Sequence, residues 1–168
     1  MTARYASAFG QGKLPGTPEW FTSAQTTAWD RFNALGFPTK RHEDWRYTNV
    51  SALQKLDVSS PALKTERLEE RLRPHYYAGS DTHRMVFLNG CFQPELSSKA
   101  APEGIQIGQL SKLLEDAPSN LRTKLAWETD NWTISGAERP FAYLNAAFLD
   151  DGAYIHVPRG HVEKRPVE

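Results

Sequence analysis

The chain has 168 residues, 39% of them hydrophobic, and its 20 Lys and Arg side chains balance 20 Asp and Glu. These values describe one ordinary globular domain, or two small modules, that can bury a core without disulfides. A neutral chain lacks the broad basic face with which nucleic-acid proteins bind phosphates, so we expect no nucleic-acid partner.

The cysteine content and the N-terminal sequence bear on the compartment. Cys91 is the single cysteine, so neither an internal disulfide nor a zinc site built on paired thiolates can form. The N-terminal sequence lacks the apolar core of about 7 to 15 residues of a secretory signal, and no segment approaches the roughly 18 apolar residues that span a bilayer. We expect a cytoplasmic protein without membrane contact.

The first predicted element is an amphipathic helix. Residues 1–16 are Gly-rich and weakly patterned, which predicts a mobile arm. The helix follows, with Thr17 as N-cap and Pro18 at the first helical position, and Gly36 and Pro38 end it. Its apolar residues recur at helical spacing, with Phe21 and Trp29 at the flanks of a face made of Trp20, Ala24, Ala28, Phe32 and Leu35. Such a face must pack against another element.

Shorter elements follow the first helix. Thr48 or Ser51 predicts the cap of a short helical turn, and Ser60 followed by Pro61 repeats this signature before a second helix that Pro74 ends.

A change to strand spacing marks the middle of the chain. Asn89-Gly90 is the commonest type I′ hairpin turn because both residues tolerate positive φ, and β-favouring residues flank it. The sequence "GIQIGQL" predicts a further strand, and Ser111 begins a helical stretch.

The C-terminal part predicts a polar loop, a helix and a strand. The loop is "WETDNWTISG", the helix lies in "PFAYLNAAFLDDG", and alternation over residues 153–157 predicts the strand. This strand has no obvious partner and would leave backbone groups unpaired at an edge. We therefore expect an α+β chain that is the front part of a longer protein.

"PTKRHEDWRYT", residues 38–48, is the densest group of charged and aromatic side chains. His42, Glu43 and Asp44 resemble an acid/base cluster, but consecutive residues point in different directions and would not meet at one reacting atom. We expect Trp45 and Tyr47 to be buried packing anchors and the charges to be solvated.

The same stretch could also be an anion site. Lys40, Arg41 and Arg46 supply the positive charge, whereas Glu43 and Asp44 neutralise much of it. A structural role is therefore favoured.

Two further sets of residues could carry chemistry. His156 and His161, with Asp150 or Asp151, could bind a metal, but their spacing matches no known template and a continuous strand would point the two imidazoles to opposite faces. Cys91 has no neighbouring base in the sequence, so it is interpreted as a half-buried apolar residue rather than a nucleophile. We assign no catalytic, cofactor-binding or metal-ligating residue.

Two motifs carry a resemblance to a known family. "LGFPTKRHEDWRYT", residues 35–48, resembles a signature in the N-terminal region of SufD, a component of the SUF iron–sulfur cluster assembly machinery. "PFAYLNAAFLDDGAYIHVPRG", residues 140–160, is similar to the segment that leads SufB and SufD chains into a right-handed parallel β-helix. The resemblance covers residues 17–168. It favours SufD over SufB, because SufB does not usually share the first motif.

The resemblance implies a non-catalytic scaffold rather than an enzyme. In this family SufD pairs with SufB through the β-helix bodies, and each binds the ABC-type ATPase SufC by its C-terminal region. In the family, the Cys and His residues implicated in cluster formation lie on the later β-helix and C-terminal portions. The resemblance therefore implies no cofactor bound within residues 1–168. After the arm predicted over 1–16, the resemblance implies a helical and α+β domain over 17–139 and the start of a truncated β-helix over 140–168.

Two other functions remain open from the residues alone. One is a small metal-dependent hydrolase that uses His156, His161 and Asp150 or Asp151. The other is a peptide-binding module that captures a partner strand along an open strand edge.

Overall fold

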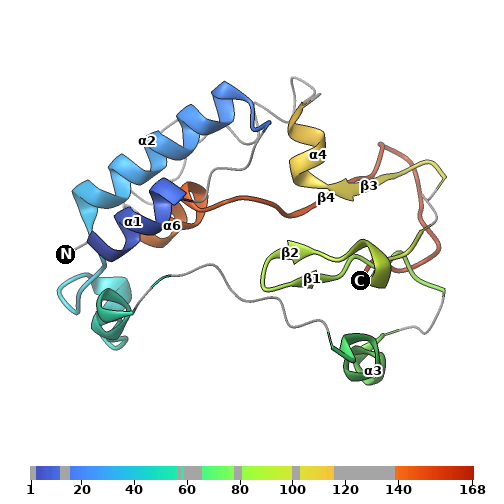
Figure 1. Cartoon of the computed structure of the whole chain (residues 1–168), viewed down its shortest axis with the longest axis horizontal. Helices are drawn as coiled ribbons and strands as arrows, with labels where there is room; N and C mark the ends of the chain where they lie inside the picture. Colours follow the sequence, from blue (N-terminus) through green and yellow to red (C-terminus); the bar gives the residue numbers. More distant parts are fainter. Residues whose placement is uncertain are drawn as a thin grey trace. The chain divides into compact units, whose positions relative to one another are not determined.

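A computed structural model gives the structure of the chain, and it describes residues 3–11, 16–56, 58, 66–77, 81–99, 103–115 and 139–168. These residues form helices and two antiparallel two-stranded sheets, which confirms the α+β class (Figure 1). The chain divides into two compact units. The first comprises Met1–Ser60 and Leu114–Asp150, and the second comprises Pro61–Leu113 and Asp151–Glu168.

Helices α2 (Glu19–Leu35) and α6 (Pro140–Ala147) form the core of the first unit. Alanines on both helices are buried, which lets the two backbones approach closely. The Gln25 side-chain amide donates to the Leu149 carbonyl at 2.9 Å, so a buried polar group also ties the α2 helix to the end of α6. Phe32 is fully buried, and its ring meets that of Phe37 edge to face at 5.1 Å.

The predicted first helix is confirmed with two corrections. Its N-cap is Pro18 rather than Thr17, because Pro18 has extended backbone angles and its carbonyl accepts the first helical hydrogen bonds. The buried face includes Phe21, which was expected at a flank, whereas Trp20 is only half-buried. Gly36 ends the helix at a φ of 70°, as predicted.

Helix α1 (Ala3–Gln11) occupies most of the segment in which a mobile arm is predicted. Tyr5 is buried and its hydroxyl donates to the Leu53 carbonyl at 2.7 Å. The Phe9 ring stacks on Trp29 with centroids 5.0 Å apart. Tyr5 and Phe9 are four residues apart and share one helix face, a signal that the glycines around them obscure in the sequence.

Short 3₁₀ helices connect α2 to the rest of the first unit. They span Glu43–Trp45 and Ser51–Lys55, and the second confirms the predicted helical turn near Ser51. The Asn49 side-chain oxygen accepts the amide of Ser51 at 3.1 Å, which provides the local polar contact at its start.

In the second unit, helix α3 (Leu68–Leu72) continues directly into a 3₁₀ helix over Arg73–His75. The α-helix thus ends just before Pro74, as predicted, and Pro74 lies in the first turn of the 3₁₀ helix, where a proline loses no hydrogen bond. The predicted start at Ser60 and Pro61 lies outside the described residues, as do the loop "WETDNWTISG" and the helical stretch expected after Pro118.

The predicted hairpin is confirmed. Strands β1 (Phe87–Leu88) and β2 (Cys91–Phe92) pair antiparallel, and a 3₁₀ helix over Pro94–Leu96 follows. Asn89 and Gly90 have φ angles of 50° and 85°, as a type I′ turn requires. Cys91 is exposed, not half-buried as expected. Each strand of the hairpin has two residues, and the rings of Phe87 and Phe92 pack with their centroids 5.4 Å apart.

The C-terminal strand has a partner, which corrects the expectation of an unpaired strand. Strand β4 (Ala153–His156) pairs antiparallel with β3 (Gln106–Gln109) along its whole length. Sequence separation hides this pairing, since no local signal joins the two strands. Helix α4 (Leu110–Glu115) follows β3 and begins one residue before the predicted Ser111.

No parallel β-helix is formed by the described residues, whose two sheets are both antiparallel. A single parallel bridge joins His83 to Val167. The start of a β-helix over residues 140–168 therefore stays a prediction. No helix in the described ranges is long and apolar enough to cross a membrane.

Candidate functional site

The charged stretch at residues 38–48 folds into a turn that does not gather its acid and base groups. His42, Glu43 and Asp44 are all exposed. The His42 Nδ1 atom lies 3.0 Å from the amide nitrogen of Thr39, so this imidazole folds back on its own turn. Lys40 and Arg41 are exposed as well.

The two aromatic residues of this turn differ in a way that the sequence does not predict. Trp45 is half-buried, and its ring centroid lies 5.1 Å from that of Phe141. Tyr47 is 90% exposed, with the Arg46 guanidinium 5.6 Å from its ring centroid, so its prediction as a buried anchor is wrong. Trp45 is the last residue of the 3₁₀ helix, whereas Tyr47 lies in the turn that follows it and is exposed to solvent.

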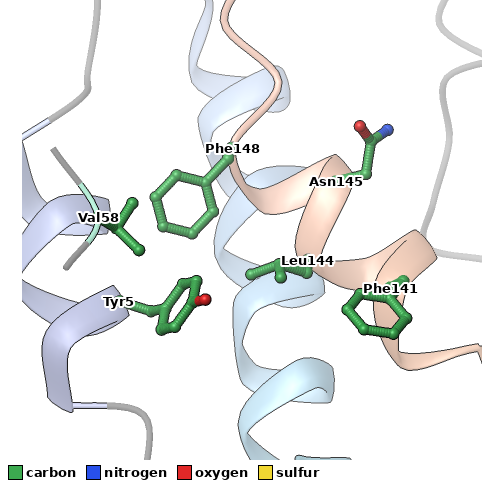
Figure 2. Close-up of a pocket in the computed structure, with 6 residues that line it drawn as sticks. All are labelled: Tyr5, Val58, Phe141, Leu144, Asn145 and Phe148. Carbon is green, nitrogen blue, oxygen red and sulfur yellow. The ribbon is translucent and has the colours of Figure 1, made fainter. Parts of the chain in front are cut away.

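An apolar pocket lies in the first unit, with a volume of about 410 Å³ (Figure 2). Aromatic and aliphatic side chains form most of its wall, and its lining residues are Tyr5, Val58, Phe141, Leu144, Asn145 and Phe148. Burial raises the pKa of the Tyr5 hydroxyl. The pocket has the size of a ligand site, but its wall offers little to orient a polar molecule.

The residues considered as a metal site are not brought together. Asp150 is exposed after the end of α6, and His156 lies in strand β4 opposite Gln106. Asp151 accepts the amide of Ser111 at 3.1 Å and the Gln109 side-chain amide at 2.5 Å, which fixes the start of α4 beside β3. Within the ranges that the structure describes, no three His, Cys, Asp or Glu residues could hold a metal ion.

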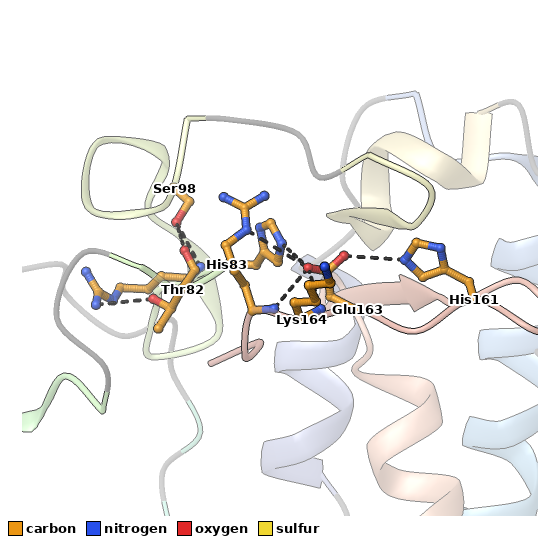
Figure 3. A network of polar contacts seen from close by, with 8 residues as sticks. Thr82, His83, Ser98, His161, Glu163 and Lys164 are labelled. Atoms are coloured by element: carbon orange, nitrogen blue, oxygen red, sulfur yellow. Dashed lines mark hydrogen bonds and ion pairs between the residues drawn. The ribbon is translucent and has the colours of Figure 1, made fainter.

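Instead, His161 belongs to a polar cluster that the sequence does not predict (Figure 3). The Glu163 carboxylate lies between two imidazoles: its Oε1 is 3.4 Å from Nε2 of His83, and its Oε2 is 3.5 Å from Nε2 of His161. The Oε1 atom also accepts the amides of Lys164 and Arg165 at 3.1 and 3.0 Å. Glu163 and His83 are 80 positions apart in the chain, so no spacing rule could have paired them.

A second carboxylate lies at the end of the same segment. Glu168 pairs with the guanidinium of Arg84, and its Oε2 accepts the amide of Tyr77 at 2.7 Å. Arg84 in turn lies 3.5 Å from the centroid of the Tyr76 ring. The charge on each of these side chains is thus met by an opposite charge, a backbone amide or an aromatic face.

Comparison with known proteins assigns the chain to a family. Residues 16–168 match the family model described as the SufBD protein N-terminal region. The chain belongs to the SufB/SufD family. This result confirms the resemblance to the SufB/SufD family that the two motifs carry. Both motifs lie entirely inside the matched range.

A curated relative supports the same assignment. It is an iron–sulfur cluster assembly SufBD family protein of Synechocystis sp. (strain PCC 6803), 29% identical over 139 residues. The alignment covers 82% of this chain but only 29% of the relative. The chain thus spans less than a third of the length of the curated relative that it matches.

Proposed function

We propose that the chain is the N-terminal part of a SufD-like scaffold protein that acts, without catalysis of its own, in a SufBCD complex assembling and transferring iron–sulfur clusters. The observation that carries this proposal is the family match over residues 16–168. The first motif, residues 35–48, favours SufD over SufB within the family.

The use of the ionisable side chains supports a structural role. Asp151 fixes the start of a helix, and His42 contacts the backbone of its own turn. Glu163 and Glu168 hold the C-terminal residues in place through backbone amides and basic side chains. The same groups would have to be released from these contacts before they could act on a substrate.

The proposed partners are a SufB-like paralogue and a SufC-like ABC ATPase in the cytoplasm. They would bind mostly through parts of the full-length protein beyond residue 168. Residues 140–168 would lead into the β-helix that forms those parts, and α6 and β4 provide a helix and a strand at this position. The cluster is the cargo of the whole complex, and no cofactor is proposed for this segment.

Reconstitution of the complex tests the proposal. The native-length protein is co-expressed with the SufB-like and SufC-like proteins of its source and analysed by size-exclusion chromatography. We expect one complex that contains all three. Failure of the native-length protein to join either partner would overturn the proposal.

A second mixture distinguishes a SufD-like protein from a SufB-like protein. A SufD-like protein should bind SufC together with SufB, and should not replace SufB in a mixture with an authentic SufD. Formation of a complex with SufD and SufC in the absence of SufB would instead identify the protein as SufB-like.

A further inference from the structure

Within the second unit, polar contacts hold most of residues 161–168 against residues 76–85. The His83 amide donates to the Pro166 carbonyl at 2.9 Å, the Glu168 amide to the His83 carbonyl at 3.0 Å, and the Met85 amide to the Glu168 carbonyl at 2.8 Å. Apolar burial adds little, because Val162 is 81% exposed and Val167 38% exposed. The attachment therefore depends on hydrogen bonds and charge.

Two carboxylates anchor this segment at its ends. Glu163 faces His83 from the neighbouring segment, and His161 and Arg165 from its own. Its side chain is only 18% exposed, so water replaces these partners poorly. Figure 3 shows the contacts of Glu163 with the two imidazoles. Glu168 faces Arg84, which lies over the ring of Tyr76.

His83 is the unusual member of this group. Its side chain is 3% exposed, and its Nε2 atom makes no hydrogen bond although Glu163 lies 3.4 Å away. A buried nitrogen without a hydrogen bond costs stability. Proton binding would turn this contact into an ion pair, so the structure holds an interaction that becomes stronger when the imidazole is charged.

We propose that Glu163 and Glu168 form an ionisation-controlled clasp, which holds residues 161–168 against residues 76–85 and opens when the two carboxylates are protonated. The proposal rests on these contacts alone and does not depend on the proposed function.

The carboxylate titrations give the direction of opening. The amide of Arg165 foremost, with His161 and His83, lowers the pKa of Glu163 from 4.5 to about 2, against the opposing effect of burial. Burial raises the pKa of Glu168, but the Arg84 side chain and the Tyr77 amide outweigh it and lower the pKa overall. For a lowered pKa, the stabilisation is present above the ordinary value of 4.5 and is lost as the pH falls towards 2.

Amide exchange measured by NMR on the 168-residue chain tests the clasp. The reporters are the amides of His83, Met85 and Glu168, with the amide of Gln93, bonded to the Val86 carbonyl at 2.8 Å, as an internal reference. We expect Glu163→Gln to speed exchange of the three reporters by at least about tenfold at pH 6, since it removes a charged acceptor. The reference should not change.

A matched control removes the same charge elsewhere in the unit. Glu70 pairs with Arg67 at 2.6 Å, and its side chain is 66% exposed. Glu70→Gln should leave all three reporters unchanged, because an exposed pair contributes little. Equal effects of the two substitutions, or no effect of Glu163→Gln, would overturn the clasp.

A measurement on the wild-type chain keeps the proposal testable if Glu163→Gln fails to fold. In the wild-type chain, the Glu163 carboxyl carbon should titrate near 2, and titration at 4.5 would refute the proposal.

Discussion

Truncation of Trp45 and of Tyr47 should have different effects on stability. Replacing a fully buried Trp by Ala costs about 3 to 5 kcal/mol. Trp45 is half-buried and packs on Phe141, so we expect Trp45→Ala to lower the free energy of unfolding by about 2 kcal/mol. Tyr47 is 90% exposed and contacts the Arg46 guanidinium, so Tyr47→Ala should cost at most about 0.5 kcal/mol.

Urea unfolding followed by circular dichroism measures both changes on the same scale. Tyr47→Ala is the matched control, because it removes an aromatic ring two residues away in the same turn. In a thermal scan, Trp45→Ala should lower the melting temperature by about 4 to 8 °C. An unchanged melting temperature for Trp45→Ala, or an equal loss for Tyr47→Ala, would refute this account of the turn.

Three other substitutions test the packing and the backbone. Phe32→Ala, at a fully buried position of α2, should cost about 3 to 5 kcal/mol in urea unfolding; a cost below about 1 kcal/mol would contradict the assigned core. In Gly90→Ala the new Cβ would meet no atom within 4 Å, but the residue would keep a φ of 85°. The free energy of unfolding should therefore fall by about 1 kcal/mol through backbone strain alone. An unchanged melting temperature would argue against the type I′ turn. Gly104→Ala would place Cβ 2.5 Å from the His161 ring, so the NMR signals of that imidazole should shift, and unchanged signals would exclude the contact.

Local signals in the sequence predict much of the fold. Gly36 marks the end of α2, Asn89-Gly90 marks the hairpin, and helical spacing after Pro140 marks α6. Each of these signals depends on residues a few positions apart, where backbone preference and spacing are decisive.

Contacts between distant segments explain what the sequence does not predict. The pairing of β3 with β4 and the contact between His83 and Glu163 both join the middle of the chain to its end. The Tyr47 prediction fails for a related reason: aromatic character favours burial on average, but the direction of a side chain in a turn decides which ring reaches the core. At the candidate site, the sequence names His161 but not the carboxylate that it contacts.

Affinity purification from the source cells tests the central claim most directly. The native-length protein is tagged at its own locus, purified without crosslinking, and its partners are identified and quantified by mass spectrometry. The account predicts a SufB-like paralogue and a SufC-like ABC ATPase in stoichiometric amounts. Recovery of the protein alone, or only with proteins unrelated to iron–sulfur cluster assembly, would contradict it.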